Sequence, residues 1–145
     1  MINELPSPAL AQVFRLHAVL GAPLDFGELG YGRRLIVPLT GGRFTGPELN
    51  GNLMPDGSAE WQSTLPDGTV LGYLRYTLRT DGGDLLQVRS RAVRYGGSAD
   101  DFLVRATTRL QAAAPHLGWV NRGVFVSVGA HRGVGMMTYE TYLVS

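Results

Sequence analysis

Glu60 is the acidic residue whose surroundings best suit proton-transfer chemistry. The segment Glu60-Trp61-Gln62 places a carboxyl group beside a large aromatic ring, at the boundary between a turn and a predicted strand. Partial burial raises the pKa of a carboxyl group and a nearby arginine lowers it, so such a group can be tuned as a general acid or base. We predict Glu60 and Arg75 as catalytic residues and Trp61 as a ring that contacts the ligand. The alternative is a surface acid beside a core tryptophan.

Arginine is the second residue type that could do chemistry. All 13 basic residues are arginines, a bias that genomic base composition also explains. Six of them occupy odd-numbered positions in three successive strand-like segments: Arg75, Arg79, Arg89, Arg91, Arg105 and Arg109. Because side chains alternate between the faces of a strand, these arginines share one sheet face if the strands are neighbours. That face is either a solvated exterior, or a polar barrel interior in which some arginines bind a ligand anion or pair with buried acids while the apolar face packs against a partner subunit.

Trp119-Val120-Asn121 again combines an aromatic ring with a polar side chain at the start of a predicted strand. A buried amide without a partner costs free energy. An Asn121 side chain that points into a barrel therefore requires either a structural partner or a ligand. We predict Trp119 and Asn121 as ligand-binding residues.

Machinery for other kinds of catalysis is not evident. The chain contains neither cysteine nor lysine, which excludes a thiol nucleophile and Schiff-base chemistry. His17, His116 and His131 are far apart in the sequence, so we predict no metal site. The glycine-rich residues 41–46 lack the lysine of a phosphate-binding loop, and a bulge or barrel corner is expected there. We predict no cofactor.

Short strands separated by turns organise the whole chain. Strand-like segments cover residues 11–20, 33–39, 44–54 with interruptions, 60–65, 70–80, 85–95, 102–111, 120–129 and 136–144. Three connections have the residue types of β-hairpin turns: Pro55-Asp56-Gly57, Pro66-Asp67-Gly68 and Asp81-Gly82-Gly83-Asp84. Only residues 99–103 or 111–116 could supply a helical turn. The pattern predicts an all-β fold, an antiparallel β-barrel of about nine strands, with an N-terminal extension at 1–10 and a single domain at 11–145.

Charge and hydropathy limit the partners. With 145 residues the chain fits one domain, and its 13 basic and 12 acidic residues give a net charge of +1, too balanced to predict nucleic-acid binding. The N-terminus lacks a basic start followed by an apolar run, and no segment is long and apolar enough to span a bilayer. We therefore expect a cytoplasmic protein without membrane contact.

The chain resembles the family known as domain of unknown function 3237, from about residue 11 to residue 144. The matching elements, in order, are Gly32-Arg33-Arg34, Val37-Pro38, Gly41-Gly42-x-Phe44-x-Gly46-Pro47-x-Leu49-x-Gly51, Glu60-Trp61-Gln62, Asp67-Gly68, Arg75-Tyr76, Thr80-Asp81, Arg105 and Trp119-x-Asn121. The resemblance implies a lipocalin-like barrel and assigns no general function. Its pattern falls on Glu60, Trp61, Arg75, Arg91, Arg105, Trp119 and Asn121.

Three departures from that family pattern concern the site. Glu60 stands where aspartate is usual, which lengthens the reach of the carboxyl group by one methylene. Ser90-Arg91-Ala92 replaces the usual Asn-Arg-Gly. The segment at residues 96–100 is shorter than in many relatives, which would leave one barrel mouth more open.

These observations lead to one main functional hypothesis and two alternatives. The main hypothesis is a pocket for a small organic ligand, anionic or aromatic, that performs cofactor-independent acid–base chemistry on a phenolic or polyketide-like compound: a cyclisation, isomerisation or addition–elimination. Glu60 would transfer the proton, Arg75, Arg91 and Arg105 would bind the anion, and the tryptophans would stack on the ring. The alternatives are a carrier or sensor without catalysis, and a structural barrel that self-associates through its apolar face.

Overall fold

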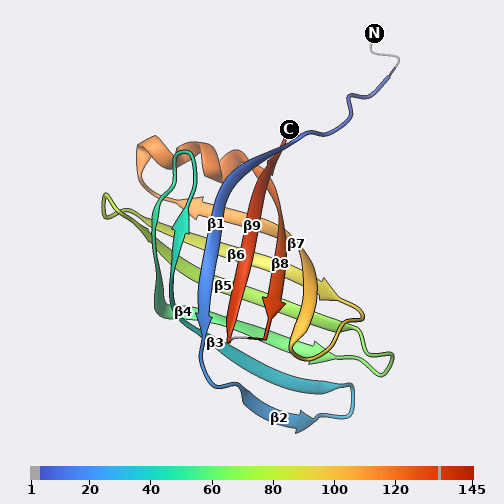
Figure 1. Ribbon diagram of the computed structural model, residues 1–145. Helices are drawn as coiled ribbons and strands as arrows, with labels where there is room; N and C mark the ends of the chain where they lie inside the picture. Colours follow the sequence, from blue (N-terminus) through green and yellow to red (C-terminus); the bar gives the residue numbers. More distant parts are fainter. Residues whose placement is uncertain (1–3, 134) are drawn as a thin grey trace.

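Nine β-strands with short connections make up most of the chain. A computed structural model describes residues 4–133 and 135–145. The elements, in order, are β1 (Leu10–Leu20), β2 (Leu24–Glu28), β3 (Arg33–Thr45), β4 (Gly51–Thr64), β5 (Val70–Thr80), β6 (Leu85–Arg94), β7 (Asp101–Ala112), the 3₁₀ helix η1 (Pro115–Arg122), β8 (Val124–Arg132) and β9 (Met136–Val144). Figure 1 shows the strands wrapping around one another with η1 at one end.

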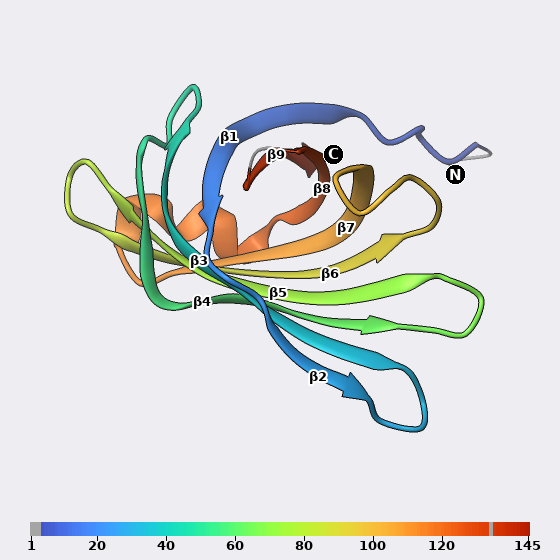
Figure 2. The same cartoon turned by 60° about the horizontal axis from the view of Figure 1, so that its bottom comes forward.

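Eight of these strands close into a barrel. Every pairing is antiparallel, and the ring runs β1-β9-β8-β7-β6-β5-β4-β3 and returns to β1. The first half of β3 pairs with β2 and its second half pairs with β1, so β2 is an extra strand outside the ring. Figure 2 shows the β2–β3 hairpin standing away from the barrel. The predicted antiparallel barrel is confirmed.

Gly42 in β3 lets two barrel strands approach closely. Gly42 has a φ of 146°, and a Cβ atom at this position would overlap the carbonyl oxygen of His17 on β1. The pairing of β3 with β4 shifts register between Pro38 and Arg43. The bulge or barrel corner predicted for residues 41–46 is therefore present as an irregularity in β3, where β3 pairs with β1 and the ring closes.

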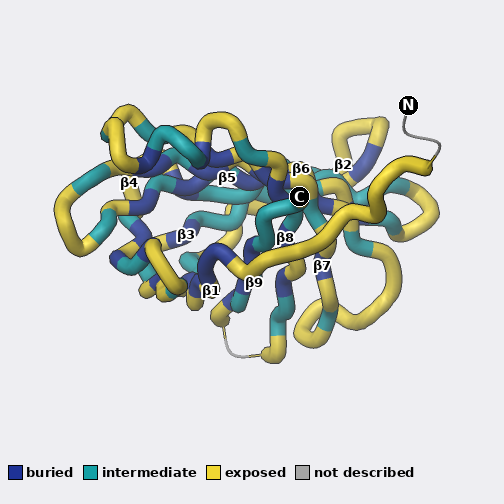
Figure 3. The backbone as a smooth tube through the Cα atoms, turned by 90° about the horizontal axis from the view of Figure 1, so that it is seen from above, coloured by how far each residue is buried: buried dark blue, intermediate teal, exposed yellow. Residues whose placement is uncertain are grey.

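The barrel interior is built from the even-numbered residues of β5 to β7 and from their counterparts on the other strands. Leu74 and Tyr76 on β5 are 1% and 2% exposed, and Val88 on β6 is fully buried. The end of the barrel nearest η1 is filled by apolar side chains, including an edge-to-face pair of Phe14 and Phe44 whose ring centroids lie 5.8 Å apart. Figure 3 shows buried and exposed positions alternating along the strands.

A row of hydroxyl groups crosses this interior. The side chains of Ser90, Thr108, Ser127 and Thr141, one on each of β6 to β9, are hydrogen-bonded in sequence at 2.8, 2.7 and 2.8 Å. All four are buried. Because each hydroxyl can donate and accept, the row satisfies buried polar groups on four adjacent strands.

Three local predictions were wrong. The short strand β2 was not expected, because Gly27 interrupts any alternation in its sequence. The helical turn lies at Pro115–Arg122 and replaces the predicted start of β8. Pro55-Asp56-Gly57 does not join two strands but forms a bulge inside β4, between the pairs Met54–Thr77 and Ala59–Arg75. No helix in the described ranges is both long and apolar enough to cross a membrane.

Candidate functional site

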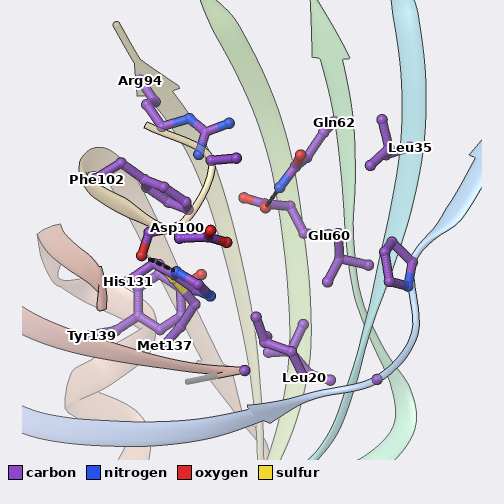
Figure 4. A pocket seen from close by; sticks show the side chains of 16 residues that line it. Leu20, Leu35, Glu60, Gln62, Arg94, Asp100, Phe102, His131, Met137 and Tyr139 are labelled. Atoms are coloured by element: carbon purple, nitrogen blue, oxygen red, sulfur yellow. Dashed lines mark hydrogen bonds between the residues drawn. The ribbon is translucent and has the colours of Figure 1, made fainter. Parts of the chain in front are cut away.

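A pocket of about 410 Å³ lies inside the barrel, at the end opposite η1. Its rim is formed where β1 and β8 end and where β7 and β9 begin, since Leu20, His131, Phe102 and Met137 line it. Leu20 and Met137 belong to its apolar walls, together with Leu35, Val37 and Leu39. Figure 4 shows the charged and polar side chains that enter this apolar space from β4, β6, β8 and β9.

Two acids line the pocket: Glu60, which is largely enclosed by protein, and Asp100, which is exposed in the loop before β7. Alternation along β4 points Glu60 and Gln62 inward, and the amide Nε2 of Gln62 donates a hydrogen bond to Oε1 of Glu60 (Figure 4). Part of the Glu60 side chain faces the pocket and protein encloses the rest. Burial raises the pKa of Glu60 above its usual 4.5, and the Gln62 hydrogen bond and the Arg94 charge only partly oppose this effect. The raised pKa means that this carboxyl group keeps its proton to a higher pH than a solvated glutamate does.

A glycine on the neighbouring strand makes room for this carboxyl group. A Cβ atom added to Gly72 of β5 would lie 2.5 Å from Oε2 of Glu60. Any side chain at this position would therefore displace the carboxyl group. Gly72 is a positioning residue for Glu60.

Tyr139 on β9 brings a phenol group to the same pocket. The residue is 4% exposed, and burial, followed by the charge of Glu60 and the neighbouring Tyr76, raises the pKa of Tyr139 well above 10.0. The phenol therefore stays protonated over the physiological range. It brings a neutral hydroxyl group to the pocket that Glu60 also lines.

One wall of the pocket is a stack of three side chains. The guanidinium carbon of Arg94 lies 3.7 Å from the centroid of the Phe102 ring, and the His131 ring stacks on Phe102 at 5.1 Å with an interplanar angle of 4°. The three follow one another in Figure 4. Within the described ranges Arg94 has no carboxylate within 4.0 Å, and burial lowers its pKa. Arg94 therefore presents a cation at the pocket that a ligand anion can neutralise.

The predicted arginine pocket was wrong, because Arg75, Arg91 and Arg105 lie on the outer face of the barrel. Their neighbours at even positions are buried, and alternation therefore sends the odd-numbered side chains outward. The solvated-exterior interpretation of this face is the one that the structure bears out. Glu60 and Arg75 accordingly point to opposite sides of the sheet and form no pair.

The predicted aromatic residues also lie outside the pocket. Trp61 follows Glu60 and so points outward, where it contacts Tyr73 with ring centroids 6.3 Å apart. Trp119 and Asn121 belong to η1, at the far end of the barrel. Asn121 holds the backbone of Ala112, accepting from its N–H at 2.9 Å and donating to its carbonyl at 2.7 Å. Its partner is therefore structural.

Three residues of the pocket were not singled out from the sequence. The alternation of side chains along β6 could have identified Arg94 as a pocket residue. It occupies an even-numbered position, as the buried Val88 and Ser90 do, and so points inward. Nothing in the sequence around Tyr139 or His131 distinguishes them from other strand residues. In residues 4–133 and 135–145, no group of three or more His, Asp or Glu side chains is arranged to hold a metal ion.

Comparison with protein families and curated sequences gives one consistent result. A family profile described as "Protein of unknown function (DUF3237)" matches residues 8–144. The UPF0311 protein RPA1785 of Rhodopseudomonas palustris is 28% identical over 138 residues, covering 86% of this chain and 90% of the relative. The UPF0311 protein CA_C3321 of Clostridium acetobutylicum is 26% identical over 142 residues, covering 97% and 79% respectively.

Solved structures show the same fold. A crystal structure of the Rhodopseudomonas palustris protein superimposes with a TM-score of 0.88 at 25% identity, covering 97% of this chain and all of that one. A β-barrel-like protein from Acinetobacter baumannii gives 0.87 at 25% identity, with 99% and 100% coverage. A protein from Penicillium herquei described as an enzyme gives 0.74 at 17% identity, with 99% and 100% coverage. With the profile match over nearly its whole length, the chain belongs to the DUF3237 family of proteins of unknown function.

Proposed function

We propose that the barrel binds a small, largely apolar or aromatic molecule with one acidic group, and that Glu60 moves a proton on it without a cofactor. The observation that carries this proposal is a carboxyl group with a raised pKa inside an apolar pocket. Burial and a raised pKa are how proteins adapt a carboxyl group to proton transfer near neutral pH. The substrates that we favour are phenolic or polyketide-like compounds.

The pocket suits such a ligand in size and in lining. Its volume of about 410 Å³ falls within the usual range for small-molecule sites, about 300 to 1,000 Å³. Aliphatic walls would bury a ring system, and the exposed face of the stack would contact its edge. Arg94 takes the anion-binding role that was first predicted for Arg75, Arg91 and Arg105.

A cyclisation illustrates the proposed chemistry. The Glu60 carboxylate takes the proton of a phenolic hydroxyl, and Arg94 stabilises the resulting phenolate. The phenolate oxygen then forms a bond to one carbon of a conjugated double bond, whose π electrons move to the other carbon. Glu60 returns its proton to that carbon. Product and substrate are isomers, so no oxidant or reductant is required.

The main alternative is a carrier or sensor that uses the same pocket. The fold alone does not choose between the two, since barrels serve both purposes. The Penicillium herquei protein of this fold is described as an enzyme, which is consistent with a catalytic use of the barrel. In a carrier, Glu60 would affect affinity and the ligand would be recovered unchanged.

A model proton abstraction tests the proposal before the natural substrate is known. The probe is 5-nitrobenzisoxazole, whose ring opens to a coloured cyanophenolate when a base removes its C–H proton. We expect the protein to accelerate this reaction, with a rate that rises with pH through the raised pKa of Glu60. Glu60→Gln should lose roughly 100-fold or more of the rate.

The matched control is Glu48→Gln, which removes an exposed carboxyl group near Trp119 of η1, away from the pocket, and should keep the full rate. Equal acceleration by Glu60→Gln and the unmodified protein would rule out Glu60 as the base. If the protein binds the probe without accelerating its opening, the carrier alternative gains support.

A further inference from the structure

The arginines excluded from the pocket form a feature of their own. Strands β5, β6 and β7 contain seven arginines and one acidic residue, Asp101, and Asp101 is paired with Arg132 of β8 at 2.5 Å. Six of the seven point outward; they are Arg75, Arg79, Arg89, Arg91, Arg105 and Arg109. In the described ranges none of the six has a carboxylate within 4.0 Å. The outer face of these strands is therefore positively charged and uncompensated.

Three of these arginines lie directly beside one another. Arg75 pairs with Arg89 across β5 and β6, and Arg89 pairs with Arg109 across β6 and β7. Like charges placed opposite each other on neighbouring strands destabilise a sheet, by roughly 0.2–1 kcal/mol for each pair. An anion bound to this row of three arginines would reduce their mutual repulsion and so stabilise the sheet.

The surface around this row is hollowed. One hollow of about 390 Å³ is lined by Arg89, Arg91 and Arg109, with the side chains of Tyr73 and Thr107. A second, of about 330 Å³, shares Tyr73 and Arg91 with the first and continues to other side chains, including Trp61, Ser63 and Arg34. We call the two together the arginine groove. No acidic residue lines it.

Aromatic rings lie between the arginines of this groove. Tyr73 has Arg91 over its ring at 5.7 Å and Trp61 beside it at 6.3 Å. Both aromatic side chains are partly exposed. The groove therefore combines guanidinium forks, which match phosphate oxygens, with ring faces on which a planar base can stack.

We propose that the arginine groove binds nucleotides, with phosphate groups on Arg89, Arg91 and Arg109 and a base on Trp61 and Tyr73. The ligand is either a free nucleotide or a nucleotide unit of a single strand, since both present the same phosphate and base. The aromatic rings favour a nucleotide over a polyanion that has no planar base. The groove lies outside the barrel wall, so this inference does not depend on the chemistry at Glu60.

The proposal revises the expectation that net charge excludes nucleic acids. The balance of 13 basic and 12 acidic residues holds for the whole chain but not for each face. Asp25 and Asp81 lie outside strands β5 to β7 and neutralise arginines of β3. A near-zero total therefore coexists with one strongly basic face, which is the electrostatic requirement for binding a phosphate backbone.

Tryptophan fluorescence gives a direct test. The chain contains two tryptophans, and Trp119→Phe leaves Trp61 as the reporter. Three probes are titrated at low and moderate salt: ATP, a short oligothymidylate and inorganic triphosphate. We expect ATP or the oligothymidylate, or both, to quench Trp61 and to bind more tightly than triphosphate. Which of the two binds more tightly identifies the source of the nucleotide.

Two paired variants separate the groove from general charge. Arg89→Gln/Arg109→Gln should weaken binding roughly tenfold or more and reduce the slope of log K against log salt by about one unit for each arginine. Arg15→Gln/Arg132→Gln removes the same charge from β1 and β8 and should leave binding nearly unchanged. Binding of these two variants is followed by anisotropy of labelled ATP or oligothymidylate.

Two outcomes would overturn the proposal. One is equal weakening by the two double variants, which would mean that only net charge matters. The other is the absence of binding by both ATP and the oligothymidylate at low salt. Trp61→Leu should weaken the binding of ATP or oligothymidylate but not the binding of triphosphate. Weaker triphosphate binding with unchanged ATP and oligothymidylate binding would contradict the placement of a base on Trp61.

Discussion

Replacing Thr108 by valine removes one buried hydroxyl group and leaves the shape of the side chain nearly unchanged. Thr108 is 8% exposed and hydrogen-bonds with Ser90 at 2.8 Å and with Ser127 at 2.7 Å. Each of these bonds contributes about 0.5–1.5 kcal/mol, so their loss should lower the free energy of unfolding by about 1–3 kcal/mol. Ser127 keeps its bond to Thr141, whereas Ser90 loses the partner it has in the row.

The preceding residue provides the control. Thr107 belongs to the same strand but points outward and is exposed, so Thr107→Val should change stability by less than about 0.5 kcal/mol. Urea unfolding of both variants measures the difference, and thermal unfolding should show a fall of about 2–4 °C for each kcal/mol lost. Equal stabilities of the two variants would refute the assignment of the inner and outer faces, on which the site depends.

Two further predictions concern the acid in the pocket. The raised pKa of Glu60 means that the folded state loses stability as pH rises from about 4.5 to that pKa, because the folded state holds this proton longer than the unfolded chain. Glu60→Gln should remove this loss, so the stability of the variant relative to the unmodified protein should increase over that window in urea unfolding; a constant difference would contradict the raised pKa. Gly72→Ala should displace the carboxyl group and slow opening of the benzisoxazole probe by up to about 100-fold, the cost that a misplacement of about 1 Å can have. Gly41→Ala should not slow it, because no atom lies within 4 Å of the new Cβ.

Much of the barrel follows from local sequence. Alternating apolar residues predicted β5, β6 and β7 nearly to the residue, because one face of each strand is buried. The strand-like segment at 136–144 matches β9. Turn residues after β4 and β5 marked the ends of those strands. Where a strand is bent or short, this signal fails: the bulge at Pro55-Asp56-Gly57 looks like a hairpin turn, and β2 has too few residues to show a period.

The site was only partly predictable, because alternation separates two faces without saying which one is inside. Glu60 and Arg75 were placed together, but the register of β4 and β5 pairs Glu60 with Leu74, so Arg75 lies on the opposite face of the sheet. The pairing of β1 with β3 closes the ring, a long-range contact that local sequence does not encode, and the buried apolar side chains then identify the inner face. Once the inner face is known, the alternation along β6 identifies Arg94 as the arginine of β5 to β7 that points inward.

The titration of Glu60 tests the central claim most directly. Carbon-13 NMR of glutamate carboxyl groups follows each side chain through its pKa, and the signal that disappears in Glu60→Gln identifies this residue. We predict that the Glu60 signal titrates above 4.5, and that a bound anionic aromatic compound shifts it. A Glu60 signal that titrates at the ordinary value, unaffected by such compounds, would place the carboxyl group in water and contradict the proposed site.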